Sequence, residues 1–255
     1  MFICNYKIRL TVAILSLFLT ATQLRAASDY QREQRWANEV IPGLIVGEPI
    51  YLTQKNQHKF LGIYSETDNK KMGLVIAHGM GLNPDAGMIS VLRQGLFDYD
   101  YTSLSIQMPI LAADASYKAY PQLFPDAAER LQIAVSYLKN KDYQNVAIVS
   151  HSNGSRMSRV YMVTNPSGVT AWVALSLTQG DSFKGIKAPV FDLYGKNDLP
   201  HVLNSVKKRK TSFKGNKVSK QMAISDANHF FSGKEQEMID AVKAFLDSIN
   251  TRVQN

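Results

Sequence analysis

The fold is decided by the stretch Val146-Ala147-Ile148-Val149-Ser150-His151-Ser152-Asn153-Gly154-Ser155. Its first four residues are apolar on consecutive positions, which is typical of a strand buried on both faces of a parallel sheet. A helical pattern at residues 156–163 follows almost at once. The stretch therefore predicts a sharp strand-to-helix turn that exposes the side chain of Ser152 at the edge of a sheet.

The same alternation of short apolar runs and longer amphipathic stretches extends along the chain. Residues 44–46 and 50–52 suggest an early strand or hairpin. Further strands are expected at residues 59–64, 73–77, 102–106, 146–149, 171–175, 189–194 and 222–224, and helices at 127–137, 156–163 and 238–249. Strands and helices that alternate with short joins predict an α/β fold, with a doubly wound, mostly parallel sheet flanked by helices in a single domain over residues 27–255.

The amino terminus has the parts of a secretory signal peptide. Lys7 and Arg9 precede an apolar stretch at residues 10–19, and small and polar residues follow, ending in Arg25-Ala26-Ala27. A membrane span wants about 20 apolar residues, so this stretch is short for one. We expect residues 1–26 to be removed and the mature protein, without a membrane span, to be periplasmic or secreted. An uncleaved membrane anchor is the alternative.

Cysteine usage limits the chemistry. The single cysteine, Cys4, lies inside the predicted signal peptide, so the mature chain has no thiol. This excludes a cysteine nucleophile, a disulfide and a cysteine-based zinc site. The sequence also lacks a dense cluster of histidine and acidic residues, so we expect neither a metal nor a cofactor.

The chain is basic, with a formal net charge of +8, and three of its basic residues but no acidic ones precede position 27. Much of the remaining positive charge comes from Lys207, Lys208, Arg209, Lys210, Lys214, Lys217 and Lys220. Such a run can attract phosphate-bearing partners. No interleaved aromatic residues or nucleic-acid motif accompany it, so we interpret it as a solvated helix and loop and expect no nucleic-acid partner.

A serine, an aspartate and a histidine, the side chains of a catalytic triad, each follow a predicted strand. Ser152 follows the strand at 146–149, Asp198 follows the strand at 189–194, and His229 follows the strand at 222–224. A serine hydroxyl becomes nucleophilic when a neighbouring base takes its proton, and a carboxylate can orient that base. The rival carboxylates are Asp192, inside its strand, and Asp226, three residues before the histidine.

Two backbone amides are candidates for binding a developing oxyanion. The strand at 73–77 ends in His78-Gly79-Met80-Gly81, where the glycines let the backbone approach a substrate closely. We expect the amides of Met80 and Asn153 to form the oxyanion hole, and His78 itself to be structural. Ser150 stands where a glycine is usual in the Gly-x-Ser-x-Gly pattern, which weakens the match.

The chain resembles the α/β-hydrolase superfamily over nearly all of its mature length. The motifs that carry the resemblance are His78-Gly79-Met80-Gly81, Ser150-His151-Ser152-Asn153-Gly154, Tyr194-Gly195-Lys196-Asn197-Asp198 and Asn228-His229-Phe230. Within that superfamily, the stretches at 192–195 and 229–233 look like an uncharacterised bacterial branch of exported hydrolase-like proteins. The resemblance implies an ester, thioester or amide bond as the target.

We therefore predict an exported serine hydrolase that cleaves carboxylic esters through an acyl-enzyme on Ser152. Its substrate is expected to be a small molecule or an acyl group of the cell envelope. Tyr117 and Tyr120 are candidates for lining the substrate pocket, although a place in the core suits them equally. The alternatives are a non-catalytic envelope protein that keeps the fold for binding, and an exported acyltransferase or peptidase.

Overall fold

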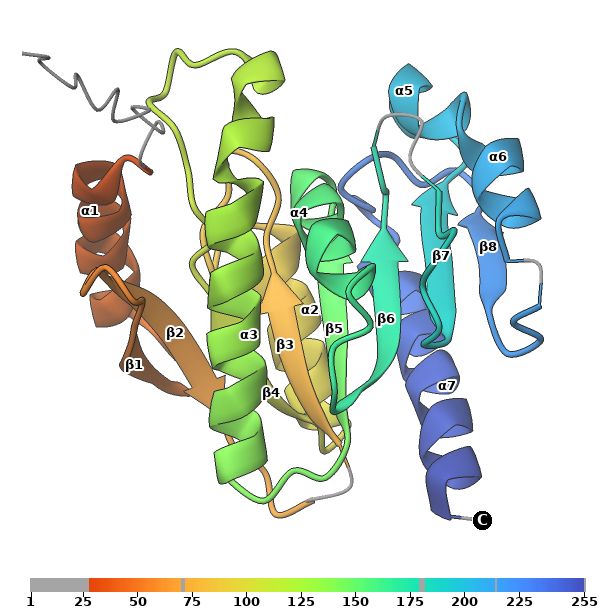
Figure 1. Ribbon diagram of the computed structural model, residues 1–255, viewed down its shortest axis with the longest axis horizontal. Coiled ribbons are helices and arrows are strands. Elements are labelled where there is room, and N and C mark those ends of the chain that lie inside the picture. The colour runs from red at the N-terminus through yellow and green to blue at the C-terminus, as the bar shows by residue number, and fades with distance from the viewer. Residues whose placement is uncertain (1–27, 70–71, 179–181, 214, 255) are drawn as a thin grey trace, which may run out of the picture.

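The computed structural model describes residues 28–69, 72–178, 182–213 and 215–254. The predicted signal peptide, residues 1–26, lies outside the described residues. Figure 1 shows a central sheet covered by helices on both faces. The predicted fold class, an α/β fold with a doubly wound, mostly parallel sheet, is confirmed.

In the described part of the chain, the sheet has eight strands in the order β1-β2-β4-β3-β5-β6-β7-β8. The pairs β1–β2 and β2–β4 are antiparallel, and all the other neighbours are parallel. The carboxyl ends of the parallel strands therefore meet at one edge, where ligands bind in open α/β sheets. The strands are β1 (Glu48–Thr53), β2 (Lys59–Ser65), β3 (Gly73–Ala77), β4 (Thr102–Ile106), β5 (Val146–His151), β6 (Val169–Leu175), β7 (Val190–Gly195) and β8 (Lys220–Ile224).

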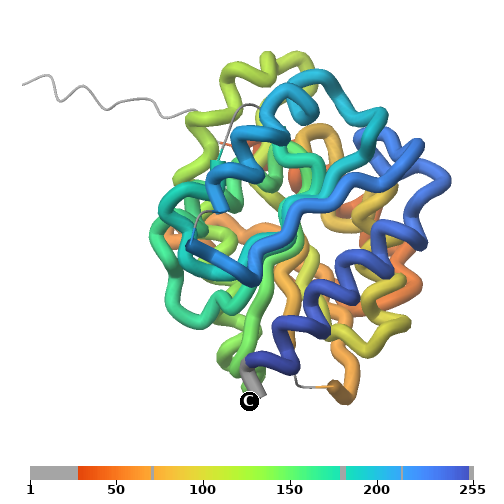
Figure 2. The backbone as a smooth tube through the Cα atoms, turned by 90° about the vertical axis from the view of Figure 1, so that its right-hand side faces the viewer, coloured from red at the N-terminus to blue at the C-terminus, as the bar shows by residue number. Residues whose placement is uncertain are grey.

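Two hydrophobic cores lie on opposite faces of the sheet, because the central strands bury apolar side chains on both sides. Figure 1 shows α3 and α4 in front of the sheet with α2 and α7 behind, and in Figure 2 the dark-blue α7 runs along one face. The helices are α1 (Tyr30–Val40), η1 (Ile41–Gly43), α2 (Met88–Asp98), η2 (Tyr117–Leu123), α3 (Phe124–Asn140), α4 (Asn153–Met162), α5 (Pro200–Leu203), α6 (Val206–Thr211) and α7 (Glu235–Gln254).

The amino-terminal part of the described chain differs most from the sequence prediction. Residues 44–46, expected in an early strand, form a loop in which Ile45 is 87% exposed. The hairpin itself is present as β1 and β2. Helix α1 was not anticipated, and its buried residues are one polar, Glu33, and one apolar, Ala37. Among the described helices, none is long and apolar enough to cross a membrane.

Candidate active site

Ser152 occupies a strained turn between β5 and α4. Its backbone has φ 55° and ψ −122°, a conformation that non-glycine residues rarely adopt. The turn is attached to the end of β6, because the Ser152 amide donates to the carbonyl of Leu175 at 2.9 Å. Gly154 makes it possible, since a Cβ at that position would lie 2.3 Å from the carbonyl oxygen of His78. The local sequence thus forces the Ser152 hydroxyl out over the sheet edge.

Ser150, the departure from the usual glycine, is accommodated by hydrogen bonds. Its hydroxyl accepts from the indole N–H of Trp172 at 2.8 Å and donates to the hydroxyl of Ser155 at 3.1 Å. The side chain is buried beneath the turn. The substitution therefore satisfies a buried tryptophan donor on the neighbouring strand and leaves the turn around Ser152 intact.

The structure brings Ser152, His229 and Asp198 into one hydrogen-bonded chain. Nε2 of His229 lies 2.8 Å from the Ser152 hydroxyl, and Nδ1 lies 2.6 Å from Oδ1 of Asp198. A carboxylate accepts only, so Nδ1 carries the proton and Nε2 is left as the acceptor for the serine hydroxyl. This is the arrangement in which an imidazole can remove the serine proton.

The carboxylate of Asp198 is fixed on both oxygens. Oδ1 also accepts from the amide of Leu199 at 2.7 Å, and Oδ2 accepts from the hydroxyl of Ser176 at 2.6 Å. Burial opposes ionisation of Asp198, but the hydrogen bonds from His229 and Ser176 outweigh it and hold the pKa of Asp198 below its usual value. Ser176 was missed from the sequence, although it follows β6 at the same sheet edge.

The rival carboxylates lie elsewhere. Asp226 is exposed on the loop after β8. Asp192 is completely buried inside β7, where both of its oxygens accept from Nε of Arg209 at 3.0 and 2.8 Å. Arg209 therefore departs from the expected solvated basic run: it is fully buried because Asp192 requires a countercharge.

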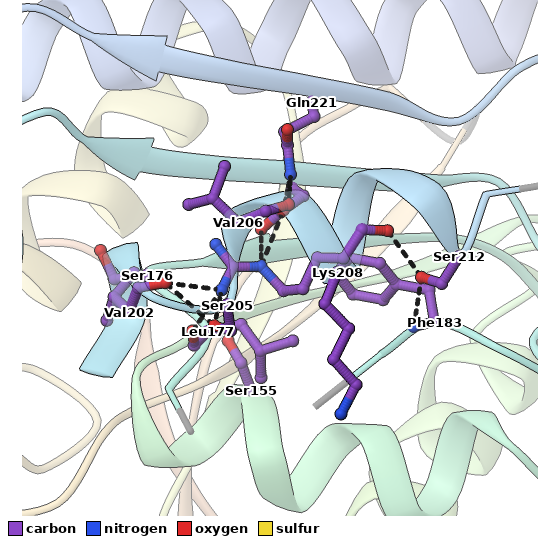
Figure 3. Close-up of polar contacts among 12 residues, drawn as sticks. Ser155, Ser176, Leu177, Phe183, Val202, Ser205, Val206, Lys208, Ser212 and Gln221 are labelled. Atoms are coloured by element: carbon purple, nitrogen blue, oxygen red, sulfur yellow. Dashed lines mark hydrogen bonds and ion pairs between the residues drawn. The ribbon is translucent and has the colours of Figure 1, made fainter. Parts of the chain in front are cut away.

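The Arg209 cluster supports the segments around Asp198. Nη1 of Arg209 donates to the carbonyls of Val202, in α5, and Leu177, just after β6. Figure 3 shows Val202, Leu177 and Ser205 gathered at one side of the cluster and Gln221 at another, whereas Lys208 points away from it. The cluster thus ties β7, α5, α6 and the turn after β6 together behind the candidate site.

The two candidate oxyanion donors flank Ser152. Asn153 is the first residue of α4, so its amide belongs to the helix terminus whose N–H groups lack intrahelical partners. Gly79 packs against the serine, because a Cβ there would lie 3.0 Å from Cβ of Ser152. Met80, the next residue, lines the pocket beside Ser152. The role of the Met80 and Asn153 amides as an oxyanion hole stays a prediction.

His151 is a neighbour that the sequence analysis left without a role. Its ring lies 4.9 Å from the ring of His229, and its Nε2 lies 2.9 Å from the His229 carbonyl. A carbonyl only accepts, so Nε2 of His151 carries a proton and anchors the backbone of the candidate base. Burial is the main cause that lowers the pKa of His151 to about 4, so the ring is neutral at neutral pH.

A pocket of about 410 Å³ opens above the serine. Tyr117 lines it, and the hydroxyl oxygen of Tyr117 lies 2.6 Å from the hydroxyl oxygen of Thr178. Tyr120, the other predicted lining residue, also belongs to η2, but its side chain is buried in the hydrophobic core and does not line the pocket. The lining residues are Met80, Tyr117, His151, Ser152, Thr178, Leu199, His201, His229 and Phe230.

The mouth of this pocket is apolar. Met80, Leu199 and Phe230 are 44%, 40% and 47% exposed, although side chains of this kind are usually buried. A cluster of exposed apolar side chains around a pocket is typical of a surface that contacts an apolar ligand group. Among the described residues, no three histidine, cysteine or acidic side chains converge as metal ligands would.

Comparison with known proteins identifies the fold. No protein-family description and no curated protein matches the sequence. A dienelactone hydrolase from Anabaena variabilis superposes with a TM-score of 0.65 at 16% identity, over 78% of this chain and 96% of that one. For a putative α/β hydrolase of unknown function from Agrobacterium tumefaciens the TM-score is 0.64 at 15% identity, over 78% and 94%. Est1E from Butyrivibrio proteoclasticus superposes with a TM-score of 0.61 at 13% identity, over 79% of this chain and 98% of that one.

The chain therefore has the α/β-hydrolase fold. The superpositions establish the fold, but sequence identities this low say nothing about the activity, which has to be argued from the site itself.

Proposed function

We propose that this protein is an exported serine hydrolase that cleaves carboxylic esters. The observation that carries the proposal is the hydrogen-bonded chain from the Ser152 hydroxyl through His229 to Asp198, at the carboxyl edge of the sheet. The amino-terminal sequence pattern supports export. The similarity of the fold to a solved esterase is consistent with the proposal and does not carry it.

The proposed reaction has two steps. The Ser152 oxygen attacks the substrate carbonyl while Nε2 of His229 takes the hydroxyl proton, and the negative oxygen is bound by the amides of Met80 and Asn153. The protonated imidazole then gives its proton to the leaving alcohol, and an acyl-enzyme on Ser152 remains. In the second step, water attacks the acyl-enzyme while His229 takes a proton from it, and the carboxylic acid is released as the serine is restored.

The pocket favours an ester with a compact apolar group. Its volume of about 410 Å³ suits a short or medium acyl chain or one aromatic ring, and its rim is apolar. The feature that favoured a non-catalytic protein, Ser150 in place of glycine, loses its force because the Ser150 hydroxyl is fully used beneath the turn.

A panel of nitrophenyl esters with acetyl, butyryl and octanoyl groups tests the proposal. We expect hydrolysis by the mature chain and a loss of at least about 10³-fold in kcat for Ser152→Ala. The matched control is Ser158→Ala, which removes the hydroxyl of another buried serine, in the helix that follows. Equal hydrolysis by the wild type and Ser152→Ala would contradict the proposed function.

A further inference from the structure

Helix α1 buries a carboxylate that the proposed reaction does not use. Glu33 is 5% exposed, and its Oε1 accepts from the Ser28 hydroxyl and lies 3.1 Å from Nη2 of Arg130. Its other oxygen lies 2.8 Å from Nε2 of His58. Burial opposes ionisation, but the hydrogen bonds from His58 and Ser28 and the charge of Arg130 keep the pKa of Glu33 below its usual value.

Arg130 continues this network toward the sheet edge. The guanidinium is completely buried, so it needs the countercharge that Glu33 supplies. Its Nη1 donates to the backbone carbonyl of Gln107 at 3.0 Å, and its Nε donates to the side-chain oxygen of Gln54 at 2.9 Å. The ion pair therefore fixes the backbone immediately after β4.

That backbone in turn fixes His78. The amide of Met108 donates to Nε2 of His78 at 2.9 Å, and the side-chain nitrogen of Gln107 lies 3.1 Å from the same atom. An amide N–H can only donate, so Nε2 is unprotonated and the ring proton is on Nδ1. Nδ1 then donates to the carbonyl of Gly79 at 2.8 Å. Burial is the main cause that lowers the pKa of His78 to about 4, which keeps this neutral tautomer at neutral pH.

The last hydrogen bond, together with a weaker one of 3.4 Å from the Leu82 amide to the same carbonyl, constrains where the candidate oxyanion donor points. The described chain has no cis peptide bonds, so the carbonyl of Gly79 and the amide of Met80 point in opposite directions. His78 holds the carbonyl on its own buried side. The N–H of Met80 is thereby turned away from His78, while Gly79 itself packs on Ser152.

Helix α1 also reaches the same segment directly. The hydroxyl oxygen of Ser28, whose proton goes to Glu33, accepts from the Ile110 amide at 2.8 Å and lies 2.9 Å from the Ile110 carbonyl oxygen. Arg32 adds a hydrogen bond of 2.7 Å to the carbonyl of Leu111, and the ring of Trp36 lies edge-on to that of His78. The residues after β4 are thus held in two ways, through Glu33 and Arg130 and through direct contacts with α1 and Ser28 just before it.

We propose that α1 is a positioning element of the active site: through Glu33, Arg130 and His78 it holds the Gly79–Met80 peptide in the orientation that binds the oxyanion. The inference rests on the proposed function for its catalytic consequence. Its residues are positioning residues, since none of Glu33, Arg130 and His78 lines the pocket.

The first test compares Glu33→Gln with Glu39→Gln, the same change at an exposed position of the same helix. We expect Glu33→Gln to lower kcat by about tenfold with KM changed less than about threefold, because displacing a transition-state donor costs less than the roughly 10²–10³-fold of removing it. It should also shift the ¹H–¹⁵N resonance of the Met80 amide. Glu39→Gln should change neither quantity. Thermal melting identifies the temperature at which each variant is fully folded.

The second test uses His78, in case Glu33→Gln fails to fold. His78→Leu removes the donor to Gly79, whereas His78→Asn places an amide nitrogen where Nδ1 lies. We expect His78→Leu to lose about 10²-fold in kcat and His78→Asn to recover at least about tenfold of that loss. A purely structural role would give losses that follow the melting temperatures, with no such recovery.

The outcomes separate this inference from the proposed function. Hydrolysis by the wild type, with an unshifted Met80 resonance and unchanged kcat in folded Glu33→Gln and His78→Leu, would overturn the inference and leave the proposed function standing. A wild type without hydrolysis would defeat the proposed function. The Met80 resonance would then still decide whether α1 holds the peptide.

Discussion

The hydrogen bonds of one carboxylate determine how His229 can act. Asp198 accepts from Nδ1 of His229 at 2.6 Å and is itself held by Ser176 and Leu199. Asparagine at position 198 would offer an amide group that can donate, and the imidazole would be free to take the wrong tautomer. We expect Asp198→Asn to lower kcat by about 10⁴-fold, as for comparable serine hydrolases.

Asp226→Asn is the control for that variant, because Asp226 is exposed on the same loop as the histidine. It should leave kcat within about twofold of the wild type. Steady-state hydrolysis of one nitrophenyl ester measures both variants. A large loss in Asp226→Asn together with full activity in Asp198→Asn would reverse the assignment of the orienting carboxylate.

Sequence order was informative for these residues because each follows a strand of a parallel sheet. Carboxyl ends of such strands meet at one edge, so Ser152, Asp198 and His229 were expected to lie together, and the structure places them within hydrogen-bonding distance. Tyr120 could not be placed in this way. It belongs to the 3₁₀ helix η2, and its burial in the core depends on tertiary packing that residue spacing does not display.

At the scale of elements, the buried pair of Asp192 and Arg209 connects β7 to α6 and α5. Removing the cation would leave a carboxylate buried without a partner. We expect Arg209→Met to lower the free energy of unfolding by about 3–5 kcal/mol. Lys210→Met, an exposed neighbour on α6, should change it by less than about 0.5 kcal/mol. Urea unfolding followed by circular dichroism measures both, and similar stabilities would show that the pair is dispensable.

The basic run shows where pattern analysis of an element reaches its limit. Lys207, Lys208 and Lys210 are exposed as expected, but Arg209 between them is fully buried. Periodicity alone does not separate a buried cation from its solvated neighbours. The available signal was Asp192, because a carboxylate inside a buried strand requires a cation from elsewhere in the chain.

For the molecule as a whole, the almost completely buried rings of His78 and His151 make stability depend on pH. Burial lowers the pKa values of His78 and His151 to about 4, whereas an unfolded chain titrates near 6.5. Between these values the unfolded state binds more protons than the native state, so the free energy of unfolding falls as the pH falls from 6.5 to 4. The expected loss is roughly 3 kcal/mol for each histidine.

Urea titrations at several pH values between 7 and 4 measure this dependence. His151→Asn, which removes one of the two groups, should show roughly half the slope of the wild type in that window. A free energy of unfolding that stays constant, or rises as the solution is acidified, would contradict the assignment of both rings as neutral in the native state.

The overall architecture was largely predictable because alternating apolar runs and amphipathic stretches specify a layered α/β sheet. Helix α1 escaped prediction for a physical reason. Glu33 interrupts the buried side of the helix beside Ala37, so the apolar stripe from which an amphipathic helix is identified is short and broken. The polar contacts of Glu33 depend on partners far along the chain, Arg130 among them.

Labelling with a fluorophosphonate tests the central claim, an activated serine at position 152, most directly. The mature protein and its Ser152→Ala variant would be incubated with the probe and analysed by intact and peptide mass. We expect one adduct per chain, located on Ser152, and none on the variant. A folded protein that gains no adduct with probes of several sizes, or gains one equally in Ser152→Ala, would contradict it.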